Sequence, residues 1–343
     1  GWVLGGDFVK SSGTLTISQT DLKLDKDLTL TSDVALSFVN LNLNHKTLTL
    51  GSANSHLTVI NPLNDGTGTI SSTTEGISTG GADLILKSFL KIDGEGSVTS
   101  TSGKVSLLAG GSLSGSGELD LSGSTWVLGG DNFTKTSGTL TMLQTDLELA
   151  DNSTLTSNEV LSFVNLNLND FTLILGSSTS DLTVQNTITI DNSTEGILTG
   201  GADLTLLASL KISNGYVTST GGIIYLHCSD ICKELGGGEL SGSGILDVSD
   251  STWVLVGNFE KDGGTLTISN THLALGGNTT LTSDVPLIFV ALNLNDYALT
   301  LGSSTSDLTV KNTITIDAST EGISTGKADL ILKSALTMSN GFL

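Results

Sequence analysis

The segment from His227 to Glu234 gathers the side chains most capable of metal or redox chemistry. It contains Cys228 and Cys232, the only two cysteines of the chain, together with His227 and Asp230. Two thiolates and an imidazole would suit zinc. The same thiols could stay free, or form a local disulfide, which is the favoured state outside the cell. We therefore predict a candidate Cys228–Cys232 disulfide that clips this segment, and no metal site.

Acidic side chains recur at a long period instead of forming one cluster. They are Glu75, Glu195 and Glu321, and then Asp83, Asp203 and Asp329. Enzymes that cleave polysaccharides need clustered carboxylates, often with calcium, and commonly an Arg or Lys as base or substrate clamp. The chain has no arginine, and a site copied along the chain is not a unique active site. We expect no catalytic residue, no enzyme activity and no cofactor beyond weakly bound calcium, and we interpret these carboxylates as solvated outer-face and turn residues.

Asparagine and tryptophan side chains at repeated positions could bind sugars. The asparagines alternate with leucine at Asn40, Asn42 and Asn44, at Asn165, Asn167 and Asn169, and at Asn293 and Asn295. They could line a sugar-binding face, but we favour hydrogen bonding between stacked backbone segments. Trp2, Trp126 and Trp253 could be stacking platforms, but we favour bulky core positions.

Thr-x-Thr triplets are frequent, and a regular array of threonines on a flat face could bind ice. One such column would run through Thr14/Thr16, Ala35/Ser37, His56/Thr58 and Gly76/Ser78. This column is too irregular to match an ice lattice, and threonine on an exposed strand needs no special function. Ice binding is therefore a minor alternative.

The chain repeats itself at two nested periods. A Trp-Val-Leu motif recurs at Trp2, Trp126 and Trp253, with nearly equal spacing between the copies. These motifs define long repeats 1–125, 126–252 and 253–343. The third copy is truncated, so we expect the parent protein to continue into further repeats.

Apolar residues also recur about every 21 residues. The series is Leu15, Leu36, Leu57, Ile77, Val98, Leu119 and Leu140. Apolar-x-apolar triplets, about seven residues apart, indicate three short strands in each step, with polar residues on the opposite face. One such coil cannot bury its own apolar face, so coils must stack.

This arithmetic predicts an all-β fold, a right-handed parallel β-helix (β-solenoid) with about 21 residues and three short strands per coil. We expect one continuous solenoid over residues 1–343, six coils per long repeat, and almost no helix. The alternative is a chain of antiparallel β-sandwiches. The steady step without paired hairpin turns disfavours it.

Two interruptions break the repeat. Between Val184 and Glu195 the second copy is five residues shorter than the first copy is between Val59 and Glu75. The segment 227–234 is about eight residues longer than its counterpart. Solenoids accept insertions as loops at a corner, so we expect a locally unique surface there.

Composition excludes several classes of partner. The net charge is -21 at pH 7 and all 14 basic residues are lysine, so no basic stripe is available for nucleic acid. No apolar run approaches the roughly 18 residues of a membrane span. Aromatic residues make up 4% of the chain, so the core must consist mainly of Leu, Ile and Val.

In its strand triplets, its richness in Gly, Ser, Thr and Asn, its few cysteines and its long repeats, the whole chain resembles large bacterial surface adhesins of the filamentous haemagglutinin-like, right-handed β-helix type. The resemblance is one of style. The Gly-Gly-x-Gly-x-Asp repeats of toxin-like β-rolls are absent, as is the hexapeptide of left-handed β-helices. The resemblance implies export, a rod-like shaft, and binding to surfaces or to itself.

We therefore expect a non-catalytic structural or adhesive shaft segment of an extracellular surface fibre or giant adhesin. Its partners would be further repeats or copies of itself, and cell-surface glycans, with no nucleic acid and no membrane insertion. The alternative is a carbohydrate-binding or carbohydrate-active β-helix protein. Sequons at Asn132, Asn152, Asn192 and Asn278 would permit glycosylation of a secreted chain.

Overall fold

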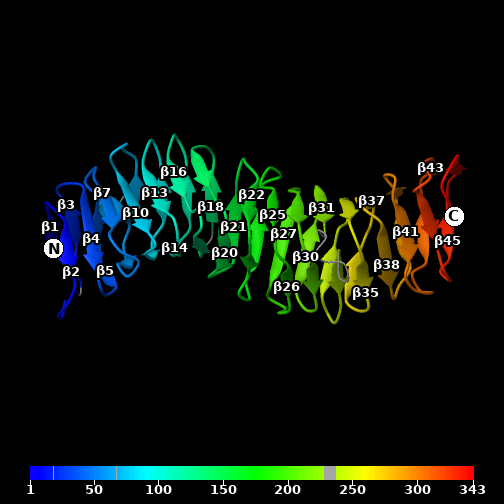
Figure 1. Cartoon of the computed structure of the whole chain (residues 1–343), viewed down its shortest axis with the longest axis horizontal. Coiled ribbons are helices and arrows are strands. Elements are labelled where there is room, and N and C mark those ends of the chain that lie inside the picture. Colours follow the sequence, from blue (N-terminus) through cyan, green and yellow to red (C-terminus); the bar gives the residue numbers. More distant parts are fainter. Residues whose placement is uncertain (18, 67, 131, 228–236) are drawn as a thin grey trace. The chain divides into compact units, whose positions relative to one another are not determined.

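The chain folds as short parallel strands that follow one another in solenoid turns of about 21 residues (Figure 1). The structure is a computed structural model and describes residues 1–17, 19–66, 68–130, 132–227 and 237–343. Three strands make one turn, and about 15 turns form a β-solenoid, as the sequence predicted. Two compact units are present, residues 1–158 with 162–171, and residues 159–161 with 172–343. The predicted continuity over residues 1–343 stays a prediction.

In the first unit, neighbouring strands of each sheet come from successive turns and run parallel. One short sheet holds β1 (Trp2–Leu4), β3 (Leu22–Leu24) and β6 (Leu41–Asn42). A second holds β2 (Phe8–Lys10), β4 (Leu28–Ser32), β7 (Thr47–Leu50), β10 (Gly76–Gly80), β13 (Ser97–Ser100), β16 (Glu118–Asp120) and β19 (Thr139–Thr141). A third holds β5 (Leu36–Phe38), β8 (Leu57–Val59), β11 (Leu84–Leu86), β14 (Lys104–Leu107), β17 (Thr125–Leu128), β20 (Asp146–Leu149) and β23 (Leu166–Asn167). Beyond α1 (Leu63–Gly66), which contacts both β6 and β9, the face of the first sheet continues with β9 (Thr69–Ile70), β12 (Leu90–Ile92), β15 (Gly111–Leu113), β18 (Asn132–Lys135) and β21 (Ser153–Thr156).

The second unit repeats this plan. One face holds β24 (Thr172–Leu175), β27 (Gly196–Gly200), β30 (Tyr216–Ser219), β33 (Ile245–Asp247) and β36 (Thr265–Thr267). Another holds β25 (Leu182–Val184), β28 (Leu204–Leu206), β31 (Ile223–Leu226), β34 (Thr252–Leu255), β37 (His272–Leu275) and β40 (Ala291–Asn293). A third holds β26 (Ile188–Ile190), β29 (Leu210–Ile212), β32 (Gly238–Leu240), β35 (Phe259–Lys261), β38 (Thr279–Ser283), β41 (Ala298–Leu301) and β44 (Gly322–Ser324). The last turns add β39 (Leu287–Phe289), β42 (Leu308–Val310), β45 (Leu330–Leu332), β43 (Ile314–Ile316) and β46 (Leu336–Met338), and β22 (Leu161–Phe163) lies at the division of the units.

Side chains alternate between the interior and the surface along each strand. In β4, Leu28 and Leu30 are buried and Thr29 between them is partly exposed. The register keeps this alternation in phase, because Leu28 lies beside Leu48 and Leu30 beside Leu50 of the next turn. Each buried leucine contributes about 2 kcal/mol through removal of apolar surface from water. The apolar interior therefore forms only when turns stack.

The long repeat is not a whole number of turns, and the expected six coils per repeat are wrong. Trp2 lies in β1, beside β3, whereas its copy Trp126 lies in β17, between β14 and β20. Six turns along the face of β1 lead to β18 and Phe133, one strand beyond Trp126. In the second unit, the copies Leu182 and Leu308 likewise belong to different sheets. Successive copies of a motif therefore lie on different faces.

One long turn explains the mismatch in the first unit. Leu57 pairs with Leu84 of the following turn, and not with Ile77. Ile77 pairs with Leu48 and Val98 on another face. Apolar triplets on all three faces look alike in sequence, so the step from Leu57 to Ile77 resembled an ordinary turn.

The period of about 21 residues makes two further predictions: that Leu36, Leu57, Leu161 and Leu182 point inward in one column, and that Leu15 lies in a strand. Leu36, Leu57, Leu161 and Leu182 are all buried, as predicted. They do not form one column, because the sheet that contains β22 and β25 has neither β5 nor β8. Leu15, placed in a strand by the sequence pattern, lies in a segment to which no strand is assigned.

The five extra residues of the first copy account for the single helical element of the described residues. Helix α1 (Leu63–Gly66) is one turn long and contacts β6 and β9. Leu63 of α1 is buried and adds an apolar side chain to the interior. Among the described residues, no helix has the length and apolar character needed to cross a membrane.

The inward position of Leu57 predicts a large effect of a charge there. Leu57→Asp would bury an unpaired carboxylate and should lower the free energy of unfolding by about 3 kcal/mol or more. The matched control is Thr58→Asp, because Thr58 faces outward from the same strand. Urea unfolding followed by circular dichroism measures both. Equal unfolding midpoints for the two variants would contradict the assigned interior face.

Candidate functional site

The repeated glutamates lie at corners of the solenoid, where their carboxylates accept hydrogen bonds from backbone N–H groups. Glu75, Glu195 and Glu321 have only 4%, 7% and 6% of their surface exposed, so the expected solvated charges are wrong. Oε2 of Glu321 accepts hydrogen bonds from the N–H groups of Asp317 at 2.7 Å and Ala318 at 3.2 Å. We call these three residues the corner glutamates. Each replaces the water that would otherwise solvate the N–H groups of a corner.

The corner glutamates make equivalent contacts in each copy. Oε2 of Glu195 accepts from the N–H groups of Asp191 at 3.0 Å and Asn192 at 3.3 Å. In the first copy Oε1 of Glu75 also accepts from the amide of Asn64 in α1, at 2.8 Å. Hydrogen bonds from backbone N–H groups, that of Asp317 above all, favour the charged form of Glu321 and lower its pKa from the ordinary value of 4.5.

The repeated aspartates tie one turn to the next. Oδ1 of Asp83 accepts from the N–H of Lys104 at 2.8 Å, and Oδ1 of Asp203 from that of Ile223 at 2.7 Å. The N–H of Asp329 donates to Oδ1 of the preceding aspartate in the stack, at 2.7 Å. The carboxylates of Asp83 and Asp203 are partly exposed, and each accepts a hydrogen bond from a strand N–H group of the next turn.

The asparagine runs confirm the structural interpretation. Asn44, Asn169 and Asn295 adopt left-handed backbone angles with φ of 50°, 49° and 49°. Asparagine tolerates this conformation better than most residues. Their Nδ2 groups donate to the carbonyl oxygens of Leu24 at 3.0 Å, Leu149 at 2.8 Å and Leu275 at 2.8 Å, one turn back.

The tryptophans occupy the core. Trp126 and Trp253 are fully buried, which confirms the core interpretation for both. The ring of Trp126 meets Phe133 edge to face with centroids 4.8 Å apart, and Trp253 meets Phe259 in the same way at 4.8 Å. The partly exposed Trp2 lies 5.6 Å from the ring of a neighbouring phenylalanine. A stacking platform for sugars would need an exposed ring face, which Trp126 and Trp253 do not offer.

A buried lysine in each copy was missed by sequence reasoning. Lys10, Lys135 and Lys261 are almost fully buried. The ammonium groups of Lys10 and Lys261 pair with Asp33 and Asp284 at the surface. The signal was present in the repeated Phe-x-Lys pattern, where lysine takes the second apolar position of a strand triplet.

The threonine column predicted from the sequence is wrong, because its last step joins residues of two different sheets. Ser78 lies between Thr49 and Thr99, and not beside Thr58. The true ladder continues from Thr99 to Asp120, so a carboxylate interrupts the hydroxyl array.

Several sequence predictions fall on the insertion. Cys228, Cys232 and Asp230 lie outside the described residues, so the candidate disulfide stays a prediction. His227 is described, and its ring stacks on Tyr225 with centroids 5.8 Å apart. Among the described residues, no group of three or more His, Cys, Asp and Glu side chains could hold a metal ion.

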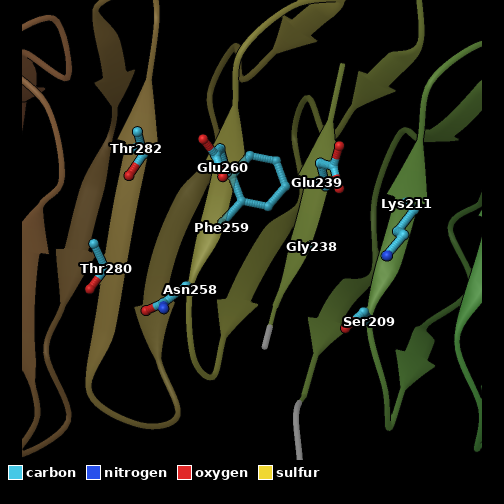
Figure 2. A pocket seen from close by; sticks show the side chains of 9 residues that line it. All are labelled: Ser209, Lys211, Gly238, Glu239, Asn258, Phe259, Glu260, Thr280 and Thr282. Carbon is cyan, nitrogen blue, oxygen red and sulfur yellow. The ribbon is translucent and has the colours of Figure 1, made fainter. Parts of the chain in front are cut away.

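A hollow of about 130 Å³ lies on the outer face of β29, β32, β35 and β38 (Figure 2). Its floor is the backbone of Gly238 and Phe259, two residues whose side-chain positions face the interior. One side is a row of side chains from successive strands, in the order Lys211, Glu239, Glu260 and Thr282. The other side is formed by Ser209, Asn258 and Thr280.

The row contains one ammonium group, that of Lys211, and two carboxylates, those of Glu239 and Glu260. Glu239 and Glu260 are direct neighbours on adjacent strands. Like charges in this arrangement destabilise a sheet. Within the described part of the chain, the side chains of Glu239, Glu260 and Lys211 form no hydrogen bond and no ion pair. Among the described residues, these side-chain donors and acceptors therefore have no partner.

This row was also missed from the sequence. Glu239 and Glu260 belong to successive turns, and only the ladder register shows that they are neighbours. Comparisons with family models, with curated proteins and with solved structures give no match. The fold itself therefore defines the class, a β-solenoid of internal repeats.

The lowered pKa of Glu321 predicts acid sensitivity of the second unit. Because the pKa of Glu321 is lower in the folded state than its ordinary 4.5, its stabilising effect is complete above that pH and is lost as pH falls below it. We expect the unfolding midpoint of the second unit to fall with pH in this acid range, and Glu321→Gln to weaken that dependence. Urea unfolding between neutral pH and about pH 3 measures it. Glu260→Gln is the control, since Glu260 is exposed and accepts no hydrogen bond from the described residues; equal pH slopes for the two variants would contradict the assignment.

Proposed function

We propose that this chain is a non-catalytic structural segment, the shaft of an extracellular surface fibre or giant adhesin. The observation that supports the proposal is that the repeated polar residues form their hydrogen bonds within the chain itself. The corner glutamates and two of the repeated aspartates, Asp83 and Asp203, accept hydrogen bonds from backbone N–H groups. The asparagines link successive turns, and two tryptophans fill the core. The repeated chemistry is therefore engaged in holding turns in register.

Repetition of identical turns suits a spacer. Each turn contacts mainly its neighbours, so turns can be added without a change of cross-section. Backbone hydrogen bonds and the side-chain ladders both run from one turn to the next. They resist bending and slippage within each unit. Natural partners of such a segment would be further repeats, copies of itself or cell-surface glycans.

The charge also favours a position outside the cell. With a net charge of -21, the surface repels copies of itself and stays hydrated. The polar outer faces are rich in threonine, serine and asparagine, which need no partner to remain soluble. An exported fibre requires this combination of a dry interior and a hydrated surface.

Immunogold electron microscopy tests the proposal. Antibodies raised against the isolated chain should label thin filaments at the surface of the source cells, and diffraction from purified filaments should give a meridional spacing of about 4.8 Å. Preimmune serum is the control. Label confined to the cell interior, or to compact soluble particles, would overturn the role. So would turnover of a polysaccharide by the isolated chain.

A further inference from the structure

The face that carries the hollow has an internal counterpart in the first unit. The inward ladder of β29, β32, β35 and β38 is Leu210, Gly238, Phe259 and Leu281. The inward ladder of β12, β15, β18 and β21 is Leu90, Gly111, Phe133 and Leu155. Because the two ladders match strand by strand, the first unit shows what this face looks like without specialisation.

Most residues that line the hollow are the same on the two faces. Lys211, Gly238, Asn258, Phe259, Thr280 and Thr282 correspond to Lys91, Gly111, Asn132, Phe133, Thr154 and Thr156. Three positions differ, and they are Phe89 against Ser209, Ser112 against Glu239, and Thr134 against Glu260. The differences fall on the walls of the hollow, and leave the floor of Gly238 and Phe259 unchanged.

The first difference affects space. Phe89 is 47% exposed, so a large ring stands on the outer surface of the first unit. At the matching position the smaller Ser209 is buried. The second unit therefore carries no aromatic ring at this position.

The other two differences affect charge. Replacement of two hydroxyl residues by Glu239 and Glu260 puts two carboxylates side by side, which costs stability. No described residue compensates them by a hydrogen bond or an ion pair. Local rules of this kind are broken mainly at functional sites.

We propose that this hollow binds a neutral glycan. Its walls offer ammonium and amide donors, carboxylate acceptors and two threonine hydroxyl groups, a mixture that matches sugar hydroxyls, which both donate and accept. The carboxylates disfavour an anionic ligand, and Lys211 in the same row disfavours a bare cation. The small volume and polar walls do not suit a large apolar ligand. The proposal goes beyond the shaft role, because it gives one face of the second unit a ligand of its own.

A glycan array tests the proposal with the full chain. We expect binding to neutral oligosaccharides of the glucan, mannan, xylan or galactan series, and not to uronic-acid series. The double variant Glu239→Ser/Glu260→Thr restores the residues of the first unit, and Ser209→Phe restores its aromatic side chain. Each should weaken the affinity for the bound oligosaccharide, measured by calorimetry, by about tenfold or more, because charge-assisted hydrogen bonds or space are lost. Unchanged circular dichroism would show that both variants fold.

Ser112→Glu/Thr134→Glu in the first unit is the matched control and should leave glycan affinity unchanged. The proposal is overturned if no neutral oligosaccharide binds, or if the restored variants bind as tightly as the parent. It is also overturned if calorimetry with calcium chloride alone detects a site that Glu239→Ser/Glu260→Thr removes while no glycan binds. None of these outcomes affects the test of the shaft, whose readout is the filament itself.

Discussion

In both units, the parallel backbone hydrogen bonds between successive turns determine which side chains become neighbours. It places Leu28 beside Leu48 on the interior side, and by the same register it places Glu239 beside Glu260 on the surface. The interior needs this pairing because no single turn can bury its apolar side chains. The same register applies to the surface, where each polar residue of a strand lies next to its counterpart one turn further along the chain. A column on the outside can therefore be a ladder of hydrogen bonds or a ligand site, with no change in the fold.

The strand pattern made the fold predictable. Alternation with a period of two residues, repeated about every seven residues, is sufficient to indicate three strands per turn and a stacked interior. The inward positions of Leu36 and Leu57 and the core positions of Trp126 and Trp253 follow from the same alternation. The assignment of strands to faces was less accurate, because triplets on the three faces are chemically alike. A turn lengthened by α1 moved Ile77 to another face without disturbing the apolar spacing.

The candidate site was not predicted, for a related physical reason. A glutamate in a sequence of turns and polar residues looks solvated, yet Glu321 is buried because corner N–H groups need an acceptor. Conversely, Glu239 and Glu260 look like separate surface charges until the register brings them together. Burial of a charge and adjacency of two charges are tertiary properties. The comparison of Ser112 with Glu239 between copies was the one signal available in the sequence.

The length of the long repeat, one strand short of a whole number of turns, has a consequence for how such a chain can evolve. In the first unit, Trp2 and Trp126 stand on different faces although they are copies of one position. A duplication or deletion of one complete repeat would therefore rotate every downstream face by one third of a revolution relative to the upstream turns. Gain or loss of three repeats together would restore the original phase. A change in the number of repeats would thus rotate a ligand-binding face about the solenoid axis in steps of one third of a revolution, without any substitution in that face.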